Sequence, residues 1–198
     1  MKLFLASKNK HKIEEFKRIL NPLGIQLLSE GDLETPLDEV DETGTTFEEN
    51  AYLKAQSALE QTGLPSIADD SGLCVDFLDG QPGIYSARFA GLPVDNAKNN
   101  EKLLSLLDGV PFEKRTARFV CSIICVFPNG EKISSFGKCE GHILTAPKGD
   151  HGFGYDPLFE SEVGCFGEIS DAEKDSVSHR GRALKDFSEK IRKYFKEV

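Results

Sequence analysis

The chain has 198 residues, of which 39% are hydrophobic and 29% are charged, and its formal net charge is −9. This length and composition are typical of one globular domain that buries a core without disulfides, and they exclude a disordered chain. The negative charge argues against a nucleic-acid polymer as partner, but not against a small phosphorylated ligand, which needs only a local group of cations.

The first part of the chain predicts strands that alternate with helices. Residues 3–6 form a short apolar strand, and residues 13–20 carry apolar side chains at helical spacing. The turn Asn21-Pro22-Leu23-Gly24 ends that helix, and residues 25–28 predict a second strand. An acidic, turn-rich stretch over residues 29–44 predicts a surface loop.

A second helix begins after this loop. Thr45 or Thr46, followed by Glu48 and Glu49, is typical of a capped helix start, and apolar residues continue the pattern to Leu59. The remaining predicted elements are, in chain order, a strand from Pro65 to Asp69, an apolar stretch over 73–78, a Gly- and Pro-rich loop over 81–88, a helix over 96–107, a hairpin of 116–127 and 131–139, a glycine-rich segment over 149–155 and a helix near 180–196.

The cysteines and the hydrophobic runs predict a cytoplasmic protein. The five cysteines are odd in number and form no Cys-x-x-Cys pair, so we expect free thiols in a reducing compartment. The histidines do not stand at finger-like spacing from them, which argues against zinc. The first apolar run is too short for a signal peptide, and no run reaches membrane-spanning length.

The most informative segment is Ile67 to Gly72, in which Asp69 and Asp70 follow a short apolar run. Acids that end a strand lie at a sheet edge, where they can hold a hard cation or accept a proton from water. Asp, Ser and Gly are equally typical of an ordinary strand-to-turn connection. The segment alone leaves both interpretations open.

Two further segments suggest phosphate and metal binding. Ser7, Asn9 and Lys12 stand where a strand passes into a helix, and backbone N–H groups at a helix start bind anions. The glycines of a Walker loop are missing, and a solvated, lysine-rich helix start is the alternative. Glu42 precedes a Thr-Gly turn and could reach a metal held by the Asp69–Asp70 pair, or it could be a solvated acid before a helix cap.

Two later segments suggest recognition of a flat ligand. Gly152 and Gly154 flank Phe153, so a ring can lie against a ligand with the backbone close by, or it can fill the core beside a tight turn. Lys174, His179 and Arg180 place three donors within seven residues. Such a cluster is also typical of a solvated surface.

Taken together, these motifs resemble the HAM1 or ITPase family of noncanonical purine nucleoside triphosphate pyrophosphatases, over nearly the whole chain. Ser7 stands where threonine is common, and Lys8 replaces a small residue. The motifs that carry the resemblance are Ser7-x-Asn9-x-x-Lys12, Glu42-Thr43-Gly44-x-Thr46-Phe47-x-Glu49-Asn50, Ala68-Asp69-Asp70-Ser71-Gly72, Pro82-Gly83-x-Tyr85-Ser86-Ala87-Arg88, Phe153-Gly154-Tyr155-Asp156-Pro157 and Ser178-His179-Arg180-Gly181.

The resemblance implies an α/β fold with a mixed central sheet flanked by helices, in one elongated domain over residues 1–198 with two lobes around a cleft. It implies hydrolysis of ITP, dITP and XTP to the monophosphate and pyrophosphate, by Mg²⁺-assisted attack of water on the α-phosphorus. It also implies a homodimer whose partners are small nucleotides. His179 or Arg180 would donate a hydrogen bond to the 6-oxygen of hypoxanthine or xanthine and disfavour the 6-amino group of adenine, which is itself a donor.

The resemblance also assigns roles to residues. Asp70 would be the proton acceptor with Asp69 as a possible helper, and Glu42 and Asp70 would hold Mg²⁺. The substrate would be bound by Ser7, Lys8, Asn9, Lys10, His11, Lys12, Ser71, Phe153, Gly154, Tyr155, Asp156, Lys174, His179 and Arg180.

Two alternatives of different kinds stay open at this point. One is a Maf-like pyrophosphatase that acts on pyrimidine triphosphates, against which the Ser-His-Arg and Phe-Gly-Tyr-Asp segments argue. The other is a nucleotide-binding module without turnover, against which the retained acids and lysines argue.

Overall fold

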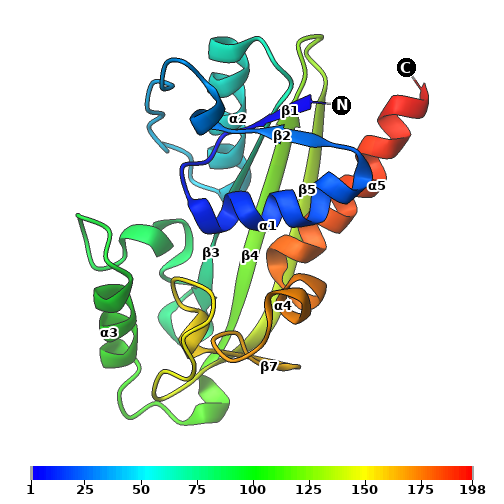
Figure 1. Ribbon diagram of the computed structural model, residues 1–198. Coiled ribbons are helices and arrows are strands. Elements are labelled where there is room, and N and C mark those ends of the chain that lie inside the picture. The colour runs from blue at the N-terminus through cyan, green and yellow to red at the C-terminus, as the bar shows by residue number, and fades with distance from the viewer. Residues whose placement is uncertain (1, 198) are drawn as a thin grey trace. The chain divides into compact units, whose positions relative to one another are not determined.

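The computed structural model describes residues 2–197 and contains a sheet with helices on its faces (Figure 1). The strands are β1 (Lys2–Leu5), β2 (Gln26–Leu28), β3 (Ser66–Val75), β4 (Thr116–Val126), β5 (Lys132–Ile143), β6 (Phe159–Ser161) and β7 (Gly164–Cys165). The helices are α1 (Lys10–Leu20), α2 (Phe47–Thr62), α3 (Asn96–Leu106), α4 (Asp171–Val177) and α5 (His179–Glu197). No helix within this part of the chain is both long enough and apolar enough to cross a membrane.

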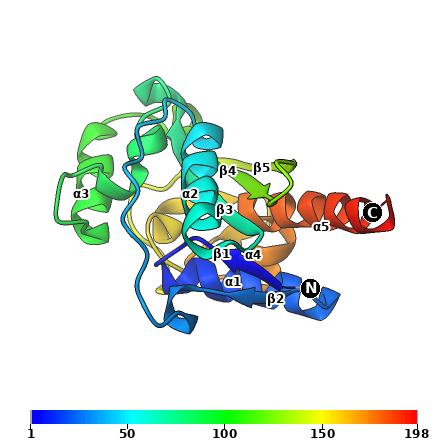
Figure 2. The ribbon, with the colours of Figure 1, turned by 90° about the horizontal axis from the view of Figure 1, so that it is seen from above.

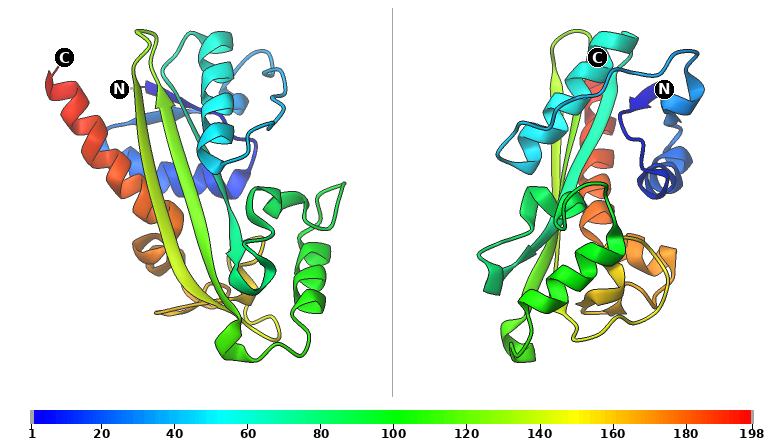
Figure 3. Two further views of the ribbon diagram at one scale, coloured as in Figure 1. Left: turned by 180° about the vertical axis from the view of Figure 1, so that it is seen from behind. Right: turned by 90° about the vertical axis from the view of Figure 1, so that its left-hand side faces the viewer.

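The sheet is mixed, which confirms the predicted fold class. Its strand order is β2-β1-β3-β4-β5-β6-β7. β1 lies parallel to both β2 and β3, with Leu5 opposite Ile67, whereas β6 is antiparallel to β5 and β7. The parallel pairs follow from strand–helix–strand connections, which return the chain to the same end of the sheet. The long hairpin of β4 and β5, predicted from Pro128-Asn129-Gly130, is visible in Figure 3.

The helix starts are set by local side chains, which was predicted for α2 only. Thr46 caps α2 and forms a reciprocal capping box with Glu49. Asn9 caps α1, where its side chain accepts a hydrogen bond from the Lys12 N–H. Gly63 ends α2 at a φ of 68°, a backbone conformation that glycine adopts without strain.

The chain folds into two compact units. Unit 1 comprises the residues up to Asp70, Cys121–Gly137 and the residues from Gly181 onward, and unit 2 comprises Ser71–Val120 and Lys138–Arg180. Strands β3, β4 and β5 and helix α5 each contribute one part to each unit.

In unit 1, the two faces of the sheet are covered by different helices, as Figure 2 shows for α1 and α2. On one face, Phe16 of α1 and Phe187 of α5 pack with Leu5 and other strand residues. On the other face, the small side chains of Ala51 and Ala55 bring α2 close to the sheet. The core of unit 2 combines aliphatic side chains with a group of aromatic rings in contact, which include Phe119, Phe159 and Phe166.

Candidate functional site

The two adjacent acids lie inside a strand rather than at its end. β3 continues from Ser66 to Val75, and Asp69 and Asp70 are only 2% and 7% exposed. The expected position at a sheet edge is therefore wrong, as is the strand-to-turn interpretation. The strand continues because apolar Leu73 and Val75 follow the acids and are fully buried. A buried acid needs partners, and each of the two acids has a cation in contact.

The two carboxylates point to opposite faces of the sheet, because successive side chains of a strand alternate. Asp69 shares the face of Ile67, on which α1 packs, and its Oδ2 lies 3.0 Å from Lys12 Nζ and 3.8 Å from Cys121 Sγ. Asp70 shares the face of Ala68, on which α2 packs. Neighbours in sequence are therefore placed in two different polar clusters.

Asp70 belongs to a cluster of which only Asp70 and Glu42 were predicted from the sequence. Lys54 Nζ of α2 lies 3.3 Å from Asp70 Oδ1 and 2.9 Å from Glu42 Oε1. Asn50 Nδ2 donates to Asp70 Oδ2 at 3.2 Å. Lys54 and Asn50 were missed as site residues, although their spacing of four positions puts both on one face of α2. Two carboxylates from distant segments thus meet at one cation.

The electrostatics of this cluster depend on burial and on mutual charge. Burial raises the pKa of Asp70, the Glu42 and Asp69 carboxylates raise it further, and the Lys54 and Lys12 ammonium groups oppose the rise. Burial lowers the pKa of Lys54, but Asp70, Asp69 and Glu42 outweigh that effect and leave it raised. Lys54 is therefore a firmly charged ammonium beside a carboxylate with increased basicity.

The donor set at Glu42 and Asp70 fits a magnesium ion. The two carboxylates already share one cationic neighbour, Lys54, so they are close enough to share a cation. Among residues 2–197 there is no group of three or more His, Cys, Asp or Glu side chains that could hold a metal. A structural zinc site needs such a group, whereas Mg²⁺ takes one or two carboxylates and fills its other positions with water and phosphate oxygens. All five cysteines are free thiols, as predicted.

The predicted anion site at the start of α1 is assembled only in part. Ser7 Oγ accepts a hydrogen bond from the Asn9 N–H, and Asn9 in turn caps the helix. Lys12 is directed to Asp69, whereas Lys8 pairs with Glu39 at 3.4 Å. The exposed side chains of the first turn are Lys10 and His11.

In unit 2, the predicted cationic cluster is buried. Lys174, His179 and Arg180 are each less than 5% exposed, so the alternative of a solvated surface is wrong. Lys174 Nζ donates to Asp156 Oδ2 at 2.6 Å, and Arg180 Nη2 donates to Ser71 Oγ at 2.8 Å. Helix α4, which carries Lys174, was not predicted from the sequence.

Two of these side chains lie near the half-buried ring of Phe153. Lys174 Nζ lies 5.0 Å and Arg180 Cζ 5.9 Å from the centre of the Phe153 ring. Asp156 Oδ2 accepts a hydrogen bond from the Phe153 N–H, and a Cβ at Gly152 would lie 2.1 Å from that same oxygen. The glycine is therefore required by the close approach of Asp156. Tyr155 is buried, and its hydroxyl donates to the Ser86 carbonyl.

His179 contributes a ring rather than an exposed donor. It starts α5, and its imidazole stacks on Phe119 with the centroids 4.7 Å apart. The four-residue segment from Phe153 to Asp156 therefore presents one ring and one backbone turn, while Tyr155 and Asp156 hold that turn in place.

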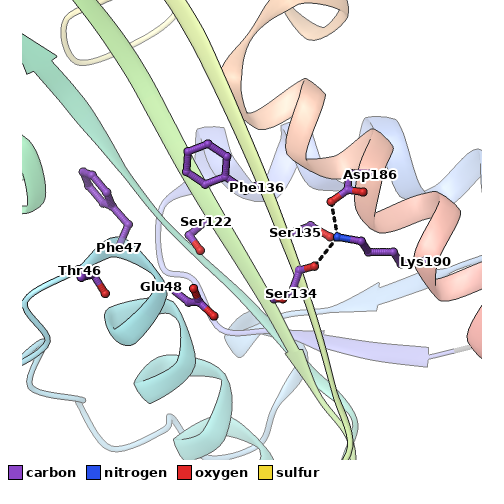
Figure 4. Close-up of a pocket in the computed structure, with 9 residues that line it drawn as sticks. All are labelled: Thr46, Phe47, Glu48, Ser122, Ser134, Ser135, Phe136, Asp186 and Lys190. Carbon is purple, nitrogen blue, oxygen red and sulfur yellow. Dashed lines mark hydrogen bonds and ion pairs between the residues drawn. The ribbon is translucent and has the colours of Figure 1, made fainter.

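A cavity of about 390 Å³ lies elsewhere in unit 1 (Figure 4). Lys190 projects into it and is bonded to Asp186 Oδ2 at 2.6 Å and to the Ser134 carbonyl at 2.8 Å. None of the sequence-predicted site residues is among the described residues that line it. Since none of the motif residues lines this cavity, we place the candidate site at the acidic cluster and not here.

Comparison with known proteins gives a consistent result. Residues 3–190 match the model of the Ham1 family. The chain is 50% identical over 197 residues to a dITP/XTP pyrophosphatase of Desulforamulus reducens, with 98% of each chain covered. It is 47% identical to a protein of the same name from Bacillus cereus, covering 96% of this chain and 95% of the relative. The solved structure of a HAM1 protein from Coxiella burnetii has a TM-score of 0.87 at 36% identity, covering 98% of this chain and 99% of that one.

Proposed function

The chain belongs to the Ham1 family, and from that membership we propose that it hydrolyses noncanonical purine nucleoside triphosphates. The substrates are dITP, XTP and ITP, and the products are the nucleoside monophosphate and pyrophosphate. The predicted family and enzyme class are confirmed by relatives that bear the name dITP/XTP pyrophosphatase over nearly their whole length.

The observation that carries the proposal is the meeting of Glu42 and Asp70 at one ammonium group. Lys54 Nζ is bonded to both carboxylates, which come from a loop and from a central strand. We propose that Glu42 and Asp70 hold Mg²⁺. When bound, the ion neutralises triphosphate charge and polarises the phosphoryl group.

The residues of unit 1 supply the remaining chemistry. Burial gives Asp70 a raised pKa, so its carboxylate can accept a proton from the attacking water. The water oxygen attacks the α-phosphorus, and pyrophosphate leaves. Lys12, which pairs with Asp69, and the N–H groups at the start of α1 are suited to phosphate oxygens.

The residues of unit 2 are suited to a purine base. The Phe153 ring offers a face for stacking, and Lys174 and Arg180 beside it offer only donors. Hypoxanthine and xanthine present an acceptor oxygen at position 6, whereas adenine presents an amino group. A site that provides donors there leaves them unpaired when adenine binds, which lowers the rate by orders of magnitude.

The test is pyrophosphate release by the purified protein from dITP, XTP, ITP, ATP, dTTP and UTP, with Mg²⁺ or with EDTA. The proposal expects release from the first three, loss of release in EDTA, and monophosphate as the second product. Preference for dTTP and UTP would support a Maf-like enzyme instead. Saturable nucleotide binding without pyrophosphate release would identify a binding module.

The proposal includes a homodimer that acts on small nucleotides in the cytoplasm. These points rest on the family resemblance, and light scattering on the purified protein tests the first. A monomer with full activity would contradict it.

A further inference from the structure

Asn50 makes a hydrogen bond at each end of its side-chain amide. It is fully buried in α2. Its Nδ2 donates to Asp70 Oδ2 at 3.2 Å, and its Oδ1 accepts from the Gly44 N–H at 2.8 Å. The amide therefore joins the central strand to the loop that carries Glu42.

Gly44 lies directly against this amide. A Cβ built at Gly44 would lie 2.6 Å from Asn50 Oδ1 and 2.7 Å from Glu49 Cβ. Real Cβ atoms do not approach so closely, so glycine is needed here for contact rather than for a left-handed backbone. The loop thus contacts the Asn50 amide at Gly44, which lies two residues after Glu42.

The cap of α2 does not explain Asn50. Thr46 and Glu49 already form this cap, because Thr46 Oγ1 accepts from the Glu49 N–H in the first turn and Glu49 Oε2 accepts from the Thr45 and Thr46 N–H groups before it. The amide of Asn50 is turned instead to a carboxylate and to a loop. A carboxamide offers a donor at one terminal atom and an acceptor at the other, which neither an ionised carboxylate nor an apolar side chain of this size can do.

From this geometry we propose that Asn50 is a positioning residue that sets the spacing of Glu42 and Asp70. One amide fixes the orientation of the Asp70 carboxylate and the backbone of the Glu42 loop together. The inference rests on the proposed function, in which these two acids share a divalent ion. In this role Asn50 acts through its hydrogen bonds with Asp70 and the Gly44 N–H.

The first experiment compares Asn50→Leu with Asn99→Leu. Asn99 is a matched control, since it is 2% exposed, lies in α3, accepts from the Ala90 N–H and donates to the Ala87 carbonyl. Both changes remove a buried amide that holds a loop, but only Asn50 contacts a carboxylate of the site. The readouts are Mn²⁺ affinity of the nucleotide-free protein by EPR, the Mg²⁺ concentration for half-maximal turnover, and the melting temperature.

Both variants should melt at a lower temperature. Asn50→Leu should weaken Mn²⁺ binding and raise the Mg²⁺ requirement by about tenfold or more, the usual effect of losing a hydrogen bond to a charged group. Asn99→Leu should change neither by more than about twofold. Glu42→Gln provides the affinity of a protein that lacks one of the two ligands.

A second variant tests the contact without emptying the core. Gly44→Ala adds one methyl group in a surface loop and should displace the loop from Asn50, whereas Gly31→Ala is its control, with no atom within 4 Å of the new Cβ. Gly44→Ala should also weaken Mn²⁺ binding, and Gly31→Ala should not. Because both changes break one contact, Asn50→Leu and Gly44→Ala combined should have less than the sum of their effects.

Unchanged Mn²⁺ affinity in both Asn50→Leu and Gly44→Ala, or fully additive effects, overturns the positioning role while the proposed function stands on wild-type turnover. The reverse result is equally clear. If the wild type binds Mn²⁺ with this dependence on Asn50 but releases no pyrophosphate, the positioning role is supported and the proposed function is overturned.

Discussion

Lys54→Met removes the cation at which the two acids meet. Lys54 Nζ lies 2.9 Å from Glu42 Oε1 and 3.3 Å from Asp70 Oδ1, and the side chain is 17% exposed. Methionine keeps most of the side-chain volume and none of the charge. The change leaves two carboxylates, 27% and 10% exposed, without their shared ammonium.

The loss of folding stability that we expect for Lys54→Met lies between two limits. Breaking a buried ion pair costs about 3–5 kcal/mol, whereas an exposed pair contributes about 0–1 kcal/mol. Because these side chains are mostly but not fully buried, we expect the free energy of unfolding to fall by about 2–3 kcal/mol in EDTA after allowing for solvent screening. Bound Mg²⁺ should restore most of the lost stability of Lys54→Met, since a ligand at about 100 times its Kd stabilises a protein by about 2.7 kcal/mol.

The assay is urea unfolding of wild type, Lys54→Met and Lys98→Met, each in EDTA and in saturating Mg²⁺. Lys98 is the control, because its side chain is 68% exposed and its pair with Asp95 measures 3.8 Å. The increase in the free energy of unfolding on adding Mg²⁺ should be larger in Lys54→Met than in wild type, because in wild type the ion must displace the Lys54 ammonium. A Lys54→Met protein as stable as wild type in EDTA, or an equal gain from Mg²⁺ in both, would refute the reasoning.

Three further predictions concern catalysis, selectivity and acid stability. Asp70→Asn should abolish pyrophosphate release. Because burial raises the native pKa of Asp70, wild type should also lose stability relative to this variant as the pH rises above about 4 in urea titrations without metal. A difference in stability that does not change with pH would contradict this. Arg180→Ala should slow ITP turnover more than ATP turnover, and an unchanged ratio would place base selection elsewhere. The Thr116 hydroxyl and then Arg118 lower the pKa of Asp76 through hydrogen bonds, and Arg118 likewise lowers the pKa of Glu140. These two ionised carboxylates therefore stabilise the fold at neutral pH, and this contribution is lost as the pH falls below about 4. Arg118→Ala should flatten that acid loss by about 1 kcal/mol or less, because these groups are at least one-third exposed; an acid limb as steep as in wild type would exclude the pairs as its cause.

Much of the fold could be predicted because its signals are local. The cap at Thr46, the turn before Gly24 and the hairpin at Pro128-Asn129-Gly130 all depend on neighbours in sequence, and all three are confirmed. The short strands β6 and β7 and helix α4 were not predicted, since a few residues carry too little periodicity to separate them from loops.

The candidate site could be predicted as a set of residues but not as an arrangement. The sequence by itself determined the family, through motifs that the relatives confirm at that level, and it predicted that Glu42 and Asp70 lie close together, as their shared contact with Lys54 shows. The tertiary structure alone decided that β3 continues through Asp69 and Asp70, that α1 packs on the face of the first and α2 on the face of the second, and that Lys54 contacts both Glu42 and Asp70. The physical reason is that alternation along a strand is local, whereas the helix and the side chains that face each carboxylate depend on how segments distant in the sequence pack together.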